Sequence, residues 1–65
     1  MIHLQMIYFN EVDEHDKVVK RWHQPMDEKL KTKKELEALR YKLENAFVAD
    51  GKNVDVRFQY LTVEE

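Results

Sequence analysis

The chain contains no cysteine and no serine, and it has only one glycine and one proline. Without cysteine there is no disulfide, no thiolate nucleophile and no cysteine-ligated zinc, and without serine the commonest catalytic hydroxyl is missing as well. A single glycine cannot form a glycine-rich phosphate loop. So little glycine and proline also leaves little material for long loops, so we expect a few regular elements joined by short turns.

Long apolar runs and a strong charge of either sign are also lacking. No segment approaches the roughly 18 apolar residues that a membrane-spanning helix needs, and no basic segment precedes the first apolar residues, so we expect a cytoplasmic protein without a membrane anchor. The net charge of -2 provides no overall field that would attract nucleic acid or an anionic membrane. With 65 residues, 43% of them hydrophobic, the chain is expected to fold as one small domain with a packed core.

Alternating apolar and polar residues predict a β-hairpin in the first part of the chain. The alternation covers residues 2–12 and returns over residues 17–24, and Pro25 is expected to end the second strand. A three-residue loop over residues 14–16, with Asp16 in the left-handed region, would join the strands. The register that follows places Val12 opposite Val18, Tyr8 opposite Trp22 and Ile7 opposite His23.

A helix and a third strand are predicted in the second part. Thr32 and Glu35 match a capping box, in which each side chain accepts a hydrogen bond from a free backbone N–H, and Gly51 is suited to end a helix, so the helix is expected over residues 33–49. Alternation resumes over residues 53–63. The sequence leaves open whether residues 26–31 are helix, strand or loop. We therefore predict an α+β fold of order β-β-α-β, a three-stranded antiparallel sheet with strand order 2-1-3 and one helix on one face.

One helix covers only one face of the sheet, so the other face is expected to be open. Strict alternation places Met6 and Tyr8 under the helix and places Ile7 and Phe9 on the uncovered side, where they would belong to an apolar patch with polar surroundings. The candidate protein-binding residues on that side are Ile7, Phe9, Val19, Arg21, His23, Arg57 and Leu61. The alternative is that a small antiparallel sheet simply presents a mixed face to water. The two edge strands offer a second way to bind a partner, by strand addition.

Two other clusters invite interpretation. Lys29, Lys31, Lys33 and Lys34 form the strongest local charge signal and are the candidates for nucleic-acid contact, although a solvated helix face is the simpler explanation. His3 and His23 are expected on one sheet face but not side by side, so we predict no metal site and no cofactor.

These features together favour a small non-enzymatic protein-interaction module over an enzyme. Its partner would be another protein or a second copy of the chain, in the manner of small inhibitors, adaptors or mobile-element accessory proteins, a comparison that rests on size and on the lack of catalytic groups. Nucleic-acid contact through the lysines is the alternative function. A homodimer with no further activity is a third reading, and no small-molecule substrate is evident.

Overall fold

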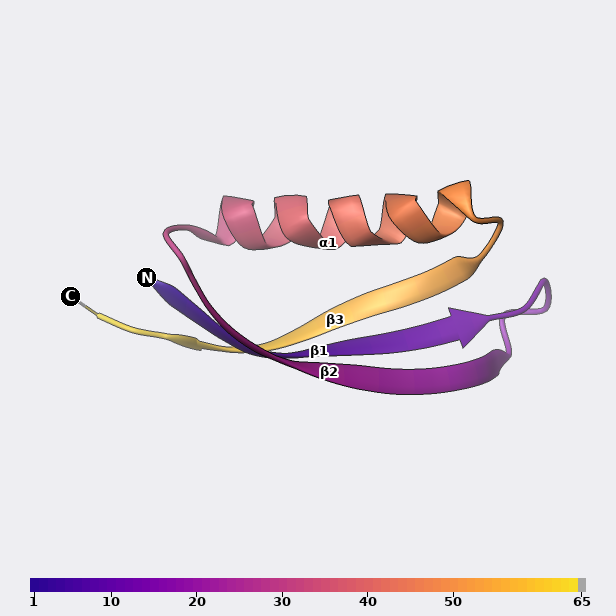
Figure 1. The fold of residues 1–65 in the computed structure, drawn as a ribbon, viewed down its shortest axis with the longest axis horizontal. Coiled ribbons are helices and arrows are strands. Elements are labelled where there is room, and N and C mark those ends of the chain that lie inside the picture. Colours follow the sequence, from indigo (N-terminus) through magenta and orange to yellow (C-terminus); the bar gives the residue numbers. More distant parts are fainter. Residues whose placement is uncertain (65) are drawn as a thin grey trace.

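The computed structural model describes residues 1–64 and shows the predicted α+β architecture. Two strands come first, β1 (Ile2–Val12) and β2 (Val18–Leu30), followed by the helix α1 (Lys33–Ala49) and the strand β3 (Asn53–Thr62). Both β2 and β3 pair antiparallel with β1, so the strand order is β2-β1-β3 as expected. The helix lies over one side of the sheet and leaves the other side uncovered (Figure 1).

The molecule is long and thin. Its principal extents are 43 × 18 × 15 Å and its radius of gyration is 13.0 Å, whereas a compact domain of this length would have a radius of gyration of roughly 11 Å. The strands bend and twist together near the middle of the sheet, and the two ends of the chain lie beside each other (Figure 1). Backbone hydrogen bonds in both directions between Met1 and Val63 join those ends.

The hairpin turn forms as the sequence predicts. Asp16 has a φ of 61°, in the left-handed region, and the backbone N–H of Asp13 donates to the carbonyl oxygen of Lys17. The carboxylate of Asp13 accepts hydrogen bonds from the backbone N–H groups of His15 and Lys17. An Asp side chain that bonds to the following backbone in this way stabilises a tight turn, so no glycine is needed.

The strand β2 is longer than predicted, because Pro25 does not end it. β2 continues to Leu30 and takes in the segment whose structure the sequence left open. Pro25 pairs with Met6 in the middle of the strand. Since β2 is an edge strand, an N–H group is needed on only one of its two sides, and proline is tolerated where its nitrogen faces solvent.

Two irregularities shift the register away from the predicted one. Val12 does lie opposite Val18, but Val19 then has no partner on β1, and Phe9 rather than Tyr8 lies opposite Trp22. Near the other end of β1, Leu4 pairs with Tyr60 and Met6 with Gln59, so Gln5 is an extra residue relative to β3. An extra residue reverses which side chains face which side of a strand.

The reversal at Gln5 changes the composition of the core. The buried apolar side chains are Ile2, Leu4, Ile7, Phe9, Leu36, Val54 and Val56. The assignment of Ile7 and Phe9 to the uncovered face is therefore wrong, since they are only 3% and 5% exposed. Tyr8, expected in the core, is 41% exposed instead.

An aromatic cluster closes the core near the hairpin end. Phe9 stacks on Trp22 with ring centroids 5.1 Å apart, and Phe47 of α1 meets both rings edge-on at 5.8 Å and 5.9 Å. The ammonium group of Lys20 lies 5.3 Å from the centre of the Trp22 ring, which adds a cation–π contact. The ring contacts of Phe47 hold the helix to the sheet at this end.

Both ends of α1 are capped. The hydroxyl of Thr32 accepts from the backbone N–H of Glu35, while the Glu35 carboxylate accepts from the N–H of Lys31, one residue before the predicted partner. Gly51, with a φ of 75°, ends the helix, and the N–H groups of Gly51 and Lys52 donate to the carbonyls of Val48 and Phe47. This pair of bonds is the Schellman motif. The predicted helix bounds are confirmed.

Candidate functional site

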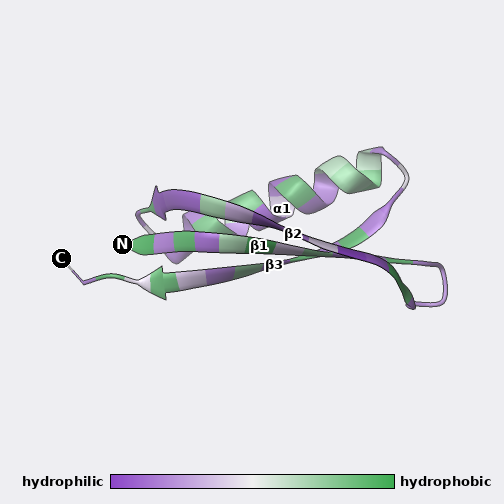
Figure 2. Cartoon of the chain, turned by 60° about the horizontal axis from the view of Figure 1, so that its bottom comes forward, coloured by the Kyte–Doolittle hydropathy of each residue, from purple (hydrophilic) through white to green (hydrophobic). Residues whose placement is uncertain are grey.

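The side of the sheet that faces away from α1 is the candidate site, and the strand register fixes its residues. Paired residues on neighbouring strands share a face, and three such rows cross the middle of the sheet on this side. We call these nine residues the open face; in rows from β2 through β1 to β3 they are Arg21–Asn10–Asp55, His23–Tyr8–Arg57 and Pro25–Met6–Gln59. Figure 2 brings this side of the molecule forward and shows hydrophilic and hydrophobic residues alternating along the strands.

The central row contains three planar side chains in sequence across the sheet. Tyr8 lies between His23 and Arg57, and the rings of Tyr8 and His23 are tilted with centroids 6.2 Å apart. The Tyr8 hydroxyl donates to Oε1 of Gln59 at 2.9 Å. Nε of Arg57 donates to a carboxylate oxygen of Asp55 at 3.1 Å. Side chains held by such contacts lose less rotamer entropy when a partner covers them.

Beyond the extra residue Gln5 the uncovered side continues with a different character. His3 lies here between Lys29 of β2 and Leu61 of β3. Nε2 of His3 is 2.6 Å from a carboxylate oxygen of Asp27, and the Asp27 side chain is 87% exposed. Leu61 is 53% exposed. This end of the sheet is therefore partly charged and partly apolar, and it borders the open face without an intervening element.

The structure places the predicted protein-binding residues in three groups. Arg21, His23 and Arg57 belong to the open face, as expected. Leu61 lies on the same side beyond Gln5, and Val19 is 58% exposed at the irregularity of β2. Ile7 and Phe9 lie in the core and are no longer candidates for a binding surface.

Tyr8 and Met6 are open-face residues that strict alternation places under the helix instead. The run from Met6 to Phe9 is apolar at every position, so both sets of alternate residues could have formed the core. Tyr8 was the one indication in this run that the set containing it faces outward, since a tyrosine hydroxyl needs a polar partner when buried and finds one easily at a surface. The pair Ile7 and Phe9 has no such group, which favours burying it.

The four candidate lysines are all exposed but come from different elements. Lys29 lies on β2 opposite His3, Lys31 precedes the helix, and Lys33 and Lys34 occupy its first turn. Adjacent helix positions point about 100° apart, so Lys33 and Lys34 face different directions. Acidic residues Asp27, Glu28, Glu35 and Glu37 are interspersed among them. A single continuous basic surface does not follow from this arrangement.

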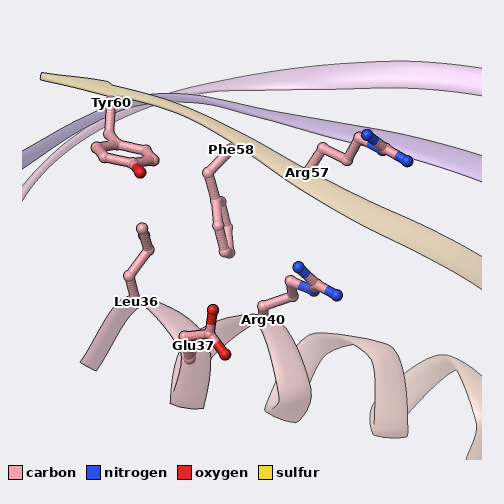
Figure 3. A pocket seen from close by; sticks show the side chains of 6 residues that line it. All are labelled: Leu36, Glu37, Arg40, Arg57, Phe58 and Tyr60. Carbon is pink, nitrogen blue, oxygen red and sulfur yellow. The ribbon is translucent and has the colours of Figure 1, made fainter. Parts of the chain in front are cut away.

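A hollow of about 260 Å³ lies between α1 and β3 (Figure 3). Phe58 and Tyr60 point from β3 toward the helix, and Leu36, Glu37 and Arg40 rise from α1 to meet them, with Arg57 at the side (Figure 3). Since all of its lining residues come from α1 and the edge strand β3, the hollow belongs to this edge of the molecule. Among residues 1–64, no polar side-chain atom is buried without a hydrogen-bond partner, so the hollow lacks the unpaired buried group typical of a ligand site.

Within the part of the chain that the structure describes, no three His, Asp or Glu side chains come together as a metal-binding group. Across that same part, α1 is too polar and too short to cross a bilayer as a helix. No protein-family model, curated protein or solved structure matches the chain.

Proposed function

We propose that the chain is a small non-enzymatic protein-interaction module that binds its partner through the open face. The observation that supports this most directly is the row His23–Tyr8–Arg57 at the centre of a face that no element of the chain covers. Tyrosine and arginine are the residues most enriched at the energetic centres of protein interfaces, and methionine is enriched there too. Of the charged residues that interfaces disfavour, lysine and glutamate are absent from the nine and aspartate occurs once, as Asp55.

The contacts within the open face support recognition of a shaped, partly polar surface. Tyr8 is held by Gln59 and Arg57 by Asp55, so these two large side chains are oriented before a partner arrives. Tyr8 also offers a large contact area with only two rotatable side-chain angles, which keeps the entropy cost of binding low. A partner with acidic groups would suit Arg21 and Arg57, whereas Asp55 would reject a strongly acidic one.

The setting that we propose is the cytoplasm, because a chain of this size without cysteine lacks the crosslinks that small extracellular domains normally need. An inhibitor or adaptor acts by occupying a surface of its partner, and such a role needs no chemistry from the module itself. We therefore propose that the chain acts as an inhibitor or an adaptor.

A matched pair of tyrosine variants tests the proposal. Tyr8 is on the open face, and Tyr41, which is 69% exposed, lies on α1. Tagged wild type, Tyr8→Ala and Tyr41→Ala would be used to capture binding proteins from a lysate, and each candidate would then be purified and titrated by calorimetry. We expect Tyr8→Ala to weaken a true partner by roughly 10- to 30-fold, the effect of an interface hot spot, and Tyr41→Ala to leave it unchanged.

The reverse pattern would contradict the proposal. Partners that survive Tyr8→Ala and a second variant, His23→Ala, but are lost with Tyr41→Ala would place binding on the helix. Circular dichroism of each variant checks that the fold is intact, because loss of an exposed side chain should leave the spectrum unchanged.

A second candidate function is contact with single-stranded nucleic acid. The observation that favours it is the presence of the exposed Tyr8 and His23 rings beside Arg21 and Arg57 on an antiparallel sheet, since single strands stack their bases on such side chains. Fluorescence anisotropy with a labelled oligothymidine would test it. Binding that weakens steeply with salt and disappears in Tyr8→Ala would support this function, and no binding at low salt would rule it out.

A further inference from the structure

The two edges of the sheet differ in how well they are protected against pairing with another strand. The regular pairing of β2 is interrupted by the unpaired Val19 and by a further register shift near Met26, and the strand also contains Pro25. Lysine, arginine and acidic side chains occupy much of its length. Proline, bulges and charged side chains are the devices by which proteins prevent edge-to-edge pairing. The β2 edge carries all three.

The β3 edge carries almost none of them. Each of the ten residues from Asn53 to Thr62 pairs with a residue of β1, so β3 is regular over its whole length. The one residue skipped in this pairing, Gln5, lies on β1. It contains no proline, glycine or lysine. Five of its residues are of types that favour strands, namely Val54, Val56, Phe58, Tyr60 and Thr62. The outer side of this strand therefore presents an uninterrupted series of backbone N–H and C=O groups that β1 does not use.

The charges of β3 select one way in which two copies of the strand can pair. Asp55 and Arg57 are its only charged residues, and they lie two positions apart on the same side. In an antiparallel pair centred on Val56, Asp55 of each copy lies opposite Arg57 of the other. Each charge then has an opposite charge beside it along its own strand and across the pair, an arrangement that favours cross-strand pairing.

The neighbouring registers lack this complementarity. Centring on Asp55 or on Arg57 places two like charges directly opposite each other, which is destabilising. Centring on Phe58 places Arg57 opposite Gln59 and Asp55 opposite Leu61. Registers shifted by a single residue would bring side chains from opposite faces of the two sheets together, because side chains alternate along a strand.

We propose that two copies of this chain associate through their β3 edges, antiparallel and centred on Val56. On the helix side, Val54 of each copy then lies opposite Phe58 of the other, so the pairing joins apolar residues as well as charges. The two sheets become one six-stranded sheet with both helices on the same side. The two open faces become neighbours on the other side, so the dimer leaves Tyr8 and His23 of each copy free for a different partner.

The association is independent of the proposed function, because it uses the edge of β3 rather than the surface around Tyr8. Asp55 and Arg57 belong to both surfaces, and for that reason the open-face experiment uses Tyr8 and His23 alone. Failure of one experiment would leave the other proposal standing.

Charge exchange between Asp55 and Arg57 tests the dimer. Sedimentation velocity and light scattering would be measured on wild type, Asp55→Arg, Arg57→Asp and the double variant Asp55→Arg/Arg57→Asp, from about 1 μM to about 1 mM, a range that spans micromolar to millimolar dissociation constants. We expect wild type to dimerise and each single variant to lose at least tenfold in dimer affinity. The double variant should regain the wild-type affinity to within about threefold, since it restores opposite charges in exchanged positions.

Mixing the two single variants gives the sharpest readout. Asp55→Arg carries two positive side chains at these positions and Arg57→Asp carries two negative ones, so the centred register pairs every charge with its opposite in the mixture. We expect a heterodimer from two monomeric solutions. Lys29→Glu, which makes a similar charge change on the β2 edge, serves as the control and should remain dimeric.

Circular dichroism and thermal unfolding of each variant separate loss of pairing from loss of fold. A wild type that stays monomeric at every concentration would overturn the proposal. So would single variants that are folded and still dimerise, or a mixture that fails to form the heterodimer. As an additional measurement, hydrogen exchange of β3 amides should slow as the wild-type concentration rises, and unchanged exchange would also count against pairing at this edge.

Discussion

The reversal of side-chain direction in β1 makes a quantitative prediction about two neighbouring residues. Phe9 is 5% exposed and contacts Trp22 and Phe47, whereas Tyr8 is 41% exposed and makes one hydrogen bond to Gln59. Replacing each by leucine keeps an apolar side chain of similar size. Phe9→Leu then removes two aromatic contacts, each worth about 0.5–1.5 kcal/mol, so we expect the free energy of unfolding to fall by about 1–3 kcal/mol. Tyr8→Leu removes a solvent-exposed hydrogen bond and the tilted ring contact with His23, both at the surface, and should cost less than about 1 kcal/mol.

The size of the Phe9 effect is large relative to the stability of the whole chain. At about 0.05–0.15 kcal/mol per residue, a 65-residue domain has a free energy of unfolding of roughly 3–10 kcal/mol. A loss of 1 kcal/mol lowers the melting temperature of so small a domain by about 4–8 °C. Phe9→Leu should therefore melt some 5–20 °C below the wild type, while Tyr8→Leu should melt within a few degrees of it.

Urea unfolding followed by far-ultraviolet circular dichroism measures both variants on one scale. Fluorescence of Trp22, the only tryptophan, gives a second probe whose agreement checks that unfolding is two-state. If Tyr8→Leu proves more destabilising than Phe9→Leu, β1 keeps its strict alternation and lacks the reversal at Gln5. Met6, Tyr8 and Asn10 would then face the helix, and the nine residues of the open face would not share one side of the sheet.

Substitutions at four further positions probe other parts of the fold, each measured by urea or thermal unfolding. Leu36→Ala should cost about 2–5 kcal/mol, because Leu36, at 7% exposure, is the only buried residue of α1, and a loss below 1 kcal/mol would show that the helix is not anchored there. Thr32→Ala should cost about 1 kcal/mol through loss of the helix cap, and Thr32→Ser should retain most of that stability. Gly51→Ala should cost about 1–2 kcal/mol through its positive φ alone, since an added Cβ meets no atom within 4 Å; a neutral result would mean that the helix ends differently. Pro25→Ala should change stability by less than about 1 kcal/mol, because β2 needs no N–H on its outer side, and a large loss would show that the proline has a packing role.

Much of the fold follows from local signals in the sequence. The hairpin turn depends on Asp13 and Asp16, and the helix ends depend on Thr32 and Gly51, all of which act through hydrogen bonds or φ preferences within a few residues. Once the helix and three strands are known, the rule of right-handed crossovers leaves few sheet orders, and the predicted one is confirmed.

The candidate site was less predictable because it depends on register. A single extra residue, Gln5, reverses the direction of every side chain between it and the turn, and nothing in the local sequence marks it. Between Met6 and Phe9 all four residues can be buried, so the decision is made by pairing with β3 and by packing on α1 rather than by β1 alone. Arg21, His23 and Arg57 were located correctly because β3 is regular and because β2 undergoes a matching shift at Val19.

The central position of β1 has a consequence for the order in which the fold can form during synthesis. β1 and β2 leave the ribosome early and can pair as a hairpin, but the second side of β1 has no partner until β3 has been made. The helix also makes most of its contacts with β3, so it has little to pack against before then. Until the last strand emerges, Ile2, Leu4, Ile7 and Phe9 lie on a two-stranded sheet without a stable cover, the kind of intermediate that aggregates. The nascent chain is therefore expected to depend on rapid completion, or on a chaperone, to a degree that the finished domain does not.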